Sequence, residues 1–175
     1  MVIKTAGFRR SKCLLAPGLP VGGFTLIEML LVLLVVAIIA MMAIPSYYPV
    51  KARGQILEAL GLADKLKPNI ESLYVATKKF PEDNEKAGLP EPEYLIGNFT
   101  KLVTLEDGAL HITLGNKVMP QVEGNILTLR PITVIDSPTS PMSWVCGYSG
   151  VPAGMKAAGK NKTDVERKFL PVSCR

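Results

Sequence analysis

The chain has 175 residues and a formal net charge of +5, from 20 basic and 15 acidic side chains. Four of the basic residues, Lys4, Arg9, Arg10 and Lys12, precede the first acid, which leaves 16 basic against 15 acidic residues, or +1, in the rest of the chain. Because the rest of the chain is nearly neutral, its net charge does not indicate nucleic-acid binding, which normally depends on clustered basic residues. About 130 residues follow the apolar run described next, enough for one hydrophobic core but not two.

A long apolar run follows the basic N-terminal region. Residues 29–50 include 22 consecutive positions without a charged side chain, and a helix of that length spans roughly 30 Å. This predicts a transmembrane helix, with the basic N-terminus in the cytoplasm and the body of the chain on the other side. A cleavable secretory signal is the alternative, but the run is longer than is usual for one and its end lacks an Ala-x-Ala site.

Beyond Pro45 the chain continues with helical periodicity in amphipathic form. Apolar residues recur at steps of three and four, which predicts a helix that packs on a folded core. Proline lacks an amide hydrogen, so we expect kinks at Pro45 and Pro68 and a helix end near Lys78 or Lys79. The predicted core positions are Ile56, Leu60, Ala63, Leu66 or Lys67, Ile70, and Leu73 or Tyr74.

A surface loop and a β-hairpin are predicted next. Residues 81–98 hold three prolines and five acids, a composition typical of a loop. Two alternating apolar runs then flank Asp107-Gly108. This dipeptide is favoured in two-residue turns where both positions need positive φ, so the pattern predicts a hairpin.

Two further strands complete the predicted sheet. Residues 125–135 predict a third strand, in which Pro131 suggests an edge position or a bulge. The stretch beginning at Met142, "MSWVCGYSG", predicts a fourth. The expected fold is therefore α+β: a long N-terminal helix whose amphipathic half packs on a four-stranded antiparallel sheet.

Cys146 and Cys174 lie on the side of the membrane where the body of the chain is expected. An exported pair favours a disulfide, and for a loop of 28 residues the chain-entropy model gives about 3–4 kcal/mol of stabilisation. Two reduced, buried cysteines are the alternative. A disulfide here would hold the final segment, which has little core of its own.

The stretch Gly23-Phe24-Thr25-Leu26-Ile27-Glu28, followed by the apolar run and Pro45, resembles the N-terminus of type IV prepilins. The resemblance covers essentially all of residues 24–175. Later stretches are similar to successive landmarks of type IVa pilins: "FPEDNEKAGLP", the predicted hairpin, "TLRP", "WVC" and the closing "KFLPVSCR".

This resemblance implies a processing site and several partners. A membrane-embedded prepilin peptidase is expected to cut between Gly23 and Phe24 and to methylate the new amine of Phe24. Further expected partners are the inner-membrane assembly platform and other pilins, with which the chain would form a homo-oligomeric helical filament. The precursor would reside in the bacterial inner membrane and the assembled subunit in the extracellular pilus, or fimbrium.

The same resemblance implies a division of the chain. Residues 1–23 would form the leader peptide, residues 24–51 the transmembrane and assembly helix, and residues 52–175 the globular pilin domain. Within that domain, the disulfide-bounded D-region would comprise residues 146–174.

Glu28 is the one charged residue at the head of the apolar run, and it is assigned with Pro45 to filament assembly. An ionised carboxylate at the centre of a bilayer costs about 2.5–3.5 kcal/mol on insertion scales, so Glu28 needs a partner or a shallow position. Our hypothesis is that it meets the positively charged amine of Phe24 on a neighbouring subunit and sets the register of the helices. The alternative is that Glu28 caps its own helix, where an acid is favourable by about 0.3–1 kcal/mol.

No catalytic chemistry is indicated by the remaining residues. His111, the single histidine, lies on a predicted strand without a second catalytic partner, so a packed or solvated strand residue is expected. The sequence shows no phosphate-binding glycine motif, metal-ligand spacing or nucleophile elbow. We predict no enzyme activity, no cofactor and no metal.

The predicted function is that of a structural subunit of a type IV pilus, for which the family offers roles in adhesion, twitching motility or DNA uptake. The alternatives are a minor pilin that acts as a DNA receptor in competence and a type II secretion pseudopilin. A DNA contact would use the basic C-terminal loop, for which a solvated surface is the simpler interpretation. The basic residues concerned are Lys156, Lys160, Lys162, Arg167, Lys168 and Arg175.

Overall fold

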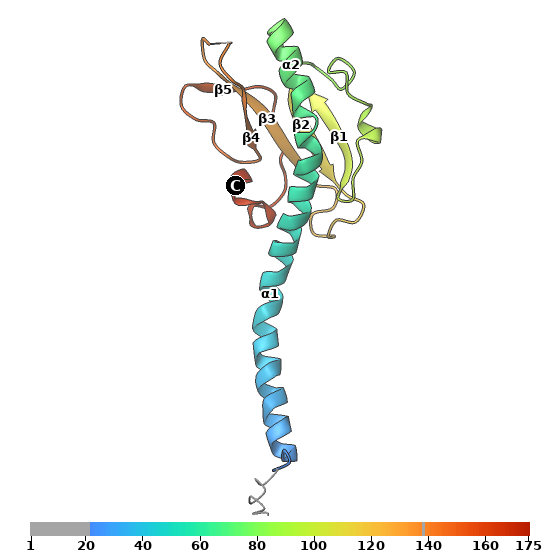
Figure 1. Ribbon diagram of the computed structural model, residues 1–175, viewed down its shortest axis with the longest axis vertical. Coiled ribbons are helices and arrows are strands. Elements are labelled where there is room, and N and C mark those ends of the chain that lie inside the picture. Colours follow the sequence, from blue (N-terminus) through green and yellow to red (C-terminus); the bar gives the residue numbers. More distant parts are fainter. Residues whose placement is uncertain (1–21, 138) are drawn as a thin grey trace, which may run out of the picture. The chain divides into compact units, whose positions relative to one another are not determined.

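The computed structural model describes residues 22–137 and 139–175, and for residues 43–46 the backbone alone. Most of the predicted leader therefore lies outside the described residues. The chain divides into two compact units, Met1–Met41 and Met42–Arg175. The second unit contains the β-sheet, α2 and the C-terminal part of α1 (Figure 1).

Two helices carry the predicted helical pattern. The first, α1 (Leu26–Asp64), is followed after a two-residue break by α2 (Lys67–Thr77). Pro68 is the second residue of α2, a position whose amide has no partner within the helix, so the proline begins a new helix rather than bending the old one. The predicted bend at Pro68 is thus a complete break. The side chain of Pro45 lies outside the described residues, and the kink expected there stays a prediction.

The end of α2 confirms the predicted helix end near Lys78. Lys78 has a left-handed backbone with φ of 58°, and its N–H donates to the carbonyl of Tyr74 at 2.8 Å. This αL closure satisfies one of the free carbonyls of the last turn. Pro81 follows three residues later and cannot continue a helix.

The sheet of the second unit has five antiparallel strands rather than the four expected. The four predicted strands are confirmed and pair in the order β1-β2-β3-β4, while a short β5 pairs with the far end of β3. Because β5 has only three residues in a stretch rich in glycine and alanine, it has no alternating pattern to predict it. The strands are β1 (Thr100–Glu106), β2 (Ala109–Leu114), β3 (Ile126–Val134), β4 (Ser143–Cys146) and β5 (Met155–Ala157).

The hairpin between β1 and β2 turns at Asp107-Gly108, as predicted. Both residues have positive φ, 49° and 84° respectively, and Glu106 pairs with Ala109 across the turn. Gly108 also lies against Phe80, since a Cβ placed on it would come within 2.8 Å of the Phe80 ring. The turn therefore joins the hairpin to the end of the helical layer.

Pro131 does not mark an edge strand or a bulge, because β3 is a central strand with continuous register. Its neighbours explain why a proline is tolerated. The pairing of β3 with β2 ends at Leu129, and its pairing with β5 begins at Ile132. Pro131 lies between the two partners, where no ladder amide is lost, and its carbonyl accepts a hydrogen bond from Ala158.

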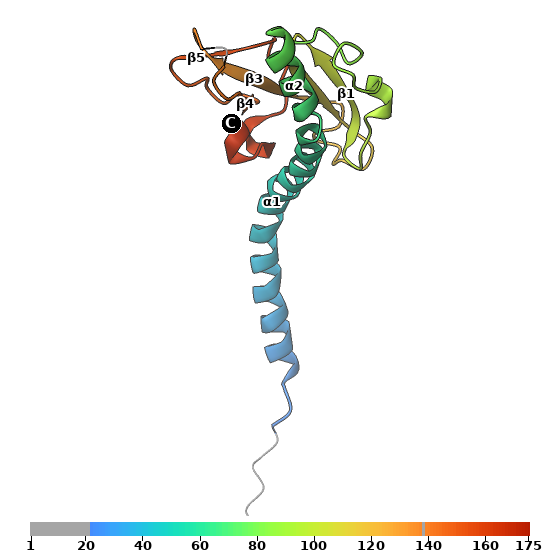
Figure 2. The same ribbon diagram turned by 45° about the horizontal axis from the view of Figure 1, so that its top comes forward.

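The core lies between the helical layer and one face of the sheet (Figure 2). Ile56 and Ile70 are fully buried, and Ala63 and Leu66 are buried as predicted, whereas Leu60 is half-buried. Ala59 is also buried, although the predicted core positions of the helix did not include it. On the sheet side the buried residues are Val103, Leu105, Leu110, Ile112, Leu114, Leu127 and Leu129, and the C-terminal segment adds Val165, Phe169, Leu170 and Cys174.

Candidate functional site

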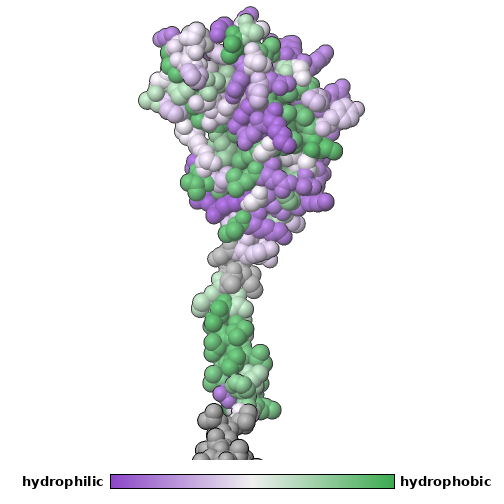
Figure 3. Space-filling view, in the orientation of Figure 1, coloured by the Kyte–Doolittle hydropathy of each residue, from purple (hydrophilic) through white to green (hydrophobic). Residues whose placement is uncertain are grey.

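The helix of the first unit is rich in exposed apolar side chains among the described residues. From Leu26 to Met41 its large hydrophobic side chains are between 46% and 79% exposed. Burying one such side chain is worth about 1.5–3 kcal/mol, and a helix that is hydrophobic all round normally lies in a core or a membrane. Figure 3 shows this helix as an almost continuous hydrophobic surface, whereas the visible face of the globular unit mixes hydrophilic and hydrophobic residues. An exposed apolar surface of this kind favours contact with lipid or with other apolar helices.

Among the described residues, no single helix has the length and apolar composition of a membrane span; the segments Leu26–Met42 and Tyr47–Thr77 meet that test only as a pair.

The start of this helix has a defined cap. Thr25 precedes the first helical residue, and its hydroxyl oxygen accepts a hydrogen bond from the N–H of Glu28 at 3.3 Å. Its carbonyl accepts from Met29 at 3.2 Å. Thr-x-x-Glu is the spacing of a capping box, in which a threonine satisfies one of the free amides of the first turn. Gly23, before the cap, lies outside the helix and is exposed, with open space around the position of a Cβ.

The carboxylate of Glu28 is exposed and has no hydrogen bond or ion pair to any other described residue. Its backbone, not its side chain, takes part in the cap. The structure thus places Gly23, Phe24 and Glu28 within one exposed stretch at the head of the helix. A carboxylate in this position can accept a cation from another molecule, because nothing in the described part of its own chain neutralises it.

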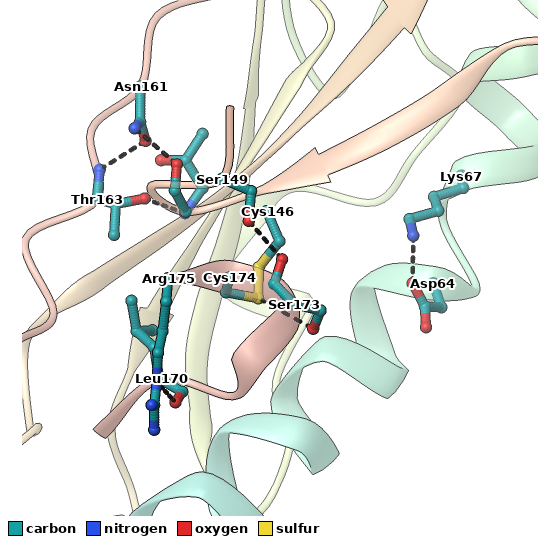
Figure 4. Close-up of a disulfide and its surroundings, with 12 residues drawn as sticks. Asp64, Lys67, Cys146, Ser149, Asn161, Thr163, Leu170, Ser173, Cys174 and Arg175 are labelled. Carbon is teal, nitrogen blue, oxygen red and sulfur yellow. Dashed lines mark hydrogen bonds and ion pairs between the residues drawn. A yellow bond between two sulfur atoms is a disulfide. The ribbon is translucent and has the colours of Figure 1, made fainter. Parts of the chain in front are cut away.

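The predicted disulfide between Cys146 and Cys174 is confirmed, with the two Cα atoms 4.5 Å apart (Figure 4). Next to it, the N–H of Tyr148 donates to the carbonyl of Cys174 at 3.0 Å. Gly147 is required here: its φ is 56°, and a Cβ would lie 2.5 Å from the carbonyl oxygen of Cys174. The last residues are therefore held both covalently and by backbone contacts.

The segment between the two cysteines runs along β3. Lys156 pairs with Thr133 near one end of the strand. At the other end the N–H of Asp164 donates to the carbonyl of Ile126 at 3.1 Å. The six basic residues of this region are consequently spread along the sheet and past its end instead of forming one cluster.

His111 is buried on the face of β2 that turns away from the helices, as expected for a packed strand residue. Its Nδ1 lies 3.0 Å from the hydroxyl of Thr128, and its Nε2 lies 3.4 Å from a carboxylate oxygen of Glu106. The Thr128 hydroxyl oxygen also accepts the N–H of Lys162 at 3.1 Å, which links His111 to the C-terminal segment.

The charges around His111 favour its neutral form. Burial lowers the pKa of His111 and the Lys162 ammonium lowers it further, against the opposing attraction of Glu106. Lys162 also forms an ion pair with Glu106, and the hydrogen bond from Lys162 lowers the pKa of Glu106. This cluster ties the C-terminal segment to the sheet. Within the described residues, no group of three or more histidines, cysteines and acids is placed to hold a metal ion.

Two buried polar residues that the sequence did not single out fix the loops of the globular unit. Asn84 donates to the carbonyls of Pro90 and Val103, both at 3.1 Å, and accepts from Leu105 at 2.7 Å. Gln55 in α1 accepts from the N–H of Met119 at 3.0 Å. No local pattern marks either residue, because their partners lie far away in the sequence.

A third contact that local patterns could not reveal joins α1 to the C-terminal segment. The guanidinium of Arg53 donates to the carbonyl of Lys168 through Nη2 at 2.9 Å and Nε at 3.3 Å. This contact places basic residues of α1 and of the C-terminal segment close together.

Comparison with known proteins matches both parts of the chain. Residues 52–175 match the family model for pilin, a bacterial filament protein, and residues 20–44 match the prokaryotic N-terminal methylation motif. The chain is 35% identical over 159 residues to a type IV major pilin protein PilE1 of Neisseria gonorrhoeae, which covers 87% of this chain and 86% of that one.

Two further relatives show the same breadth. The fimbrial protein EcpC of Eikenella corrodens is 29% identical over 158 residues, covering 87% of this chain and 90% of its own. The type IV major fimbrial protein FimA of Dichelobacter nodosus is 27% identical over 165 residues, covering 87% and 95% respectively. Together with the helix packed on an antiparallel sheet and the C-terminal disulfide, these matches show that the chain belongs to the pilin family and is a structural subunit of a bacterial filament, not an enzyme.

Proposed function

We propose that the chain is the subunit of a type IV pilus, processed between Gly23 and Phe24 and assembled through its N-terminal helix. The observation that carries this proposal is the apolar helix from Leu26 to Met41, which is exposed on all sides. The relatives named above are type IV major pilins and fimbrial proteins. Residues 24–51 would serve as the membrane and assembly helix, and residues 52–175 as the globular domain on the filament surface.

The precursor waits in the inner membrane, where lipid covers the helix. On assembly, the helices of other subunits replace the lipid. The same apolar surface suits both environments because neither demands polar partners from the helix. The expected partners are a prepilin peptidase, which cuts and methylates, an inner-membrane assembly platform and other copies of the chain.

Processing at Gly23 is supported by the local structure. A protease must bind its substrate in an extended form, and residues 22–25 are exposed and non-helical. Glycine before the cut leaves no side chain in the way. Cleavage would create a new amine at Phe24, four residues from Glu28 and on the same end of the helix.

Glu28 then has a role in register. When one apolar helix slides along an identical neighbour, the area of apolar contact changes little. A buried ion pair between the two helices, by contrast, can form at only one axial offset. The amine of Phe24 on a neighbouring subunit supplies the cation. The exposed, unpaired carboxylate of Glu28 is in keeping with such a partner in trans. Pro45 is proposed to adjust the helix during packing.

The test compares filaments from three strains by electron microscopy and mass spectrometry. Filament protein should begin at Phe24 and carry one additional methyl group. Glu28→Ala should greatly reduce filament number, while Glu93→Ala, which removes an exposed acid of the globular unit, should not. Normal filaments from Glu28→Ala would contradict the register role, and filaments built from uncut chains would contradict the proposed processing.

DNA binding is a second proposed activity, carried by the exposed Lys156 and Lys160 of the C-terminal segment. Against it, Lys162 pairs with Glu106 and Lys168 with Glu166, which reduces the free positive charge. Filaments should bind duplex DNA in a salt-sensitive way, and Lys156→Glu with Lys160→Glu should weaken that binding. Equal DNA binding by the variant would contradict this activity.

A minor pilin or a type II secretion pseudopilin would share the fold and the processing. Cells that lack such a chain would still form normal filaments.

A further inference from the structure

A group of basic residues lies where α1 contacts the C-terminal segment within the globular unit. We refer to it as the basal collar, and its definition depends on the contact between Arg53 and the carbonyl of Lys168. Lys51 lies two residues before Arg53 on the same helix, and Arg175 donates to the carbonyl of Leu170 at 3.1 Å, which keeps it beside the same segment. The collar comprises Lys51, Arg53, Arg167, Lys168 and Arg175.

The collar has an excess of positive charge. Of its five cations, Lys168 forms an ion pair with Glu166 at 2.6 Å. The backbone carbonyls that hold Arg53 and Arg175 orient these two side chains without neutralising them. Arg167 lies over the ring of Tyr148 at 4.7 Å, a contact that also leaves its charge in place. Along α1 the next acid beyond Arg53 is Glu58, which accepts a hydrogen bond from Asn98.

Apolar and amphipathic side chains accompany these charges. Val172 is 82% exposed, in the short turn between Lys168 and Arg175. On α1, Tyr47 and Tyr48 are exposed immediately before Lys51, whose ammonium lies 5.8 Å from the centre of the Tyr47 ring. Tyrosines beside basic residues at the end of an apolar helix are typical of the membrane–water interface.

We propose that the basal collar docks on anionic phospholipid headgroups while the precursor or the cleaved subunit waits in the membrane. The proposal rests on the membrane stage of the proposed function, because that stage brings the collar to the lipid surface. The phosphates of the headgroups are complementary to the five cations, the tyrosines lie at the level of the interface, and Val172 enters its outer layer. Docking would hold the globular unit against the bilayer until assembly lifts it away.

The electrostatics set the expected size of the effect. A basic residue near an anionic membrane surface contributes about 1 kcal/mol, which corresponds to about a fivefold shift in the bound population per residue. The attraction is screened within about 10 Å at 0.1 M salt. Docking should therefore depend on the fraction of anionic lipid and on ionic strength.

The test uses the full chain reconstituted in vesicles of phosphatidylcholine alone or mixed with phosphatidylglycerol. The rate at which an uncharged reagent acetylates each lysine is measured by mass spectrometry. Lys51 and Lys168 should react about fivefold more slowly with the anionic lipid, and high salt should restore their rates. Lys101 and Lys160, which are also exposed but lie outside the collar, serve as internal controls and should not change.

A matched pair of double variants distinguishes an effect of the collar from an effect of the total charge of the chain. Arg167→Glu with Arg175→Glu should abolish the lipid-dependent protection of Lys51, while Lys156→Glu with Lys160→Glu should leave it intact. Equal acetylation of Lys51 in the two kinds of vesicle would overturn the proposal. So would protection by added duplex DNA in phosphatidylcholine vesicles, or protection that rises with protein density there, since these would identify DNA or a second copy as the occupant.

Failure of the membrane stage itself gives a different result. A chain that an alkaline carbonate wash removes from both kinds of vesicle is not inserted, which contradicts the proposed function. A chain that stays inserted while Lys51 reacts equally in both contradicts only the docking of the collar.

Discussion

The side-chain oxygen of Asn84 accepts the backbone N–H of Leu105 at 2.7 Å, and through this bond a surface loop is attached to β1. The amide of Asn84 also donates to the carbonyl of Pro90, within the loop, and to that of Val103, in β1. The residue is buried, so water cannot replace these partners. Asn84 thus helps to fix a loop that is rich in prolines and acids, together with the buried Ala87 and Leu89.

Replacing Asn84 with alanine should destabilise the globular unit by about 1–3 kcal/mol, because it leaves the buried N–H of Leu105 without an acceptor. The measurement is the midpoint of thermal unfolding of the full chain in detergent. Asn98→Ala is the control, since Asn98 makes its hydrogen bond to Glu58 at the exposed surface. A midpoint for Asn84→Ala as high as that of the control would show that the loop is held by other contacts.

The disulfide is expected to stabilise the globular unit by about 3–4 kcal/mol for its loop of 28 residues. The double variant Cys146→Ser and Cys174→Ser should therefore unfold at a lower temperature, and the loss should appear first in the segment between the two positions. Hydrogen exchange followed by mass spectrometry resolves this difference. Unchanged protection of residues 147–173 would mean that the contacts with β3 are sufficient without the covalent link.

The turn at Gly108 offers a paired test of backbone conformation against packing. Gly108 and Gly124 have similar φ values, 84° and 79°, but only at Gly108 would a Cβ meet another side chain, that of Phe80. Alanine at either site should cost about 1–2 kcal/mol for the left-handed backbone. Gly108→Ala should lose more than Gly124→Ala in thermal stability, and equal losses would show that Phe80 moves aside freely.

Stability should fall on mild acidification because of His111. Its pKa is lowered in the folded chain by burial and by Lys162, so as the pH falls below the ordinary histidine pKa of about 6.5 the unfolded chain takes up a proton that the folded chain does not. The contribution is fully present above that pH and is lost as the pH falls toward the lowered pKa. His111→Gln, which cannot titrate, should show a flatter stability profile between neutral pH and the mildly acidic range.

Unfolding midpoints across this range provide the check. His111 is the one histidine of the chain, so few other side chains titrate in the same window. If His111→Gln and the unmodified chain lose stability in parallel, the proton uptake occurs elsewhere.

Much of the fold could be predicted from local patterns. Asp107-Gly108 predicted the hairpin because two successive positive φ values are accessible to few other dipeptides, and both are observed. The spacing of apolar residues after Pro45 predicted the buried face of the helix, because the period of 3.6 residues follows directly from helix geometry. The cysteine pair was predictable from compartment and chemistry.

The remainder depended on contacts between distant parts of the sequence. The strand β5 is too short to show a period, and it exists because Lys156 and its neighbours meet the free end of β3. Pro131 was misinterpreted because proline is tolerated in a central strand where one partner ends and the next begins, which only the register shows. Likewise, Arg53 joins the collar through a carbonyl 115 residues away, and no local signal reports such a contact.

The segment from Gly147 to Ser173 is tethered at both ends by the disulfide and lies outside the main order of four strands. Because the entropy of closing a loop grows by only about 0.6 kcal/mol for each doubling of its length, insertions in its exposed stretch 151–153 would leave the sheet nearly undisturbed, whereas changes at the buried Val165, Phe169 and Leu170 would not. One part of the tethered segment can thus vary in length at little cost, while another part belongs to the core that holds the domain together.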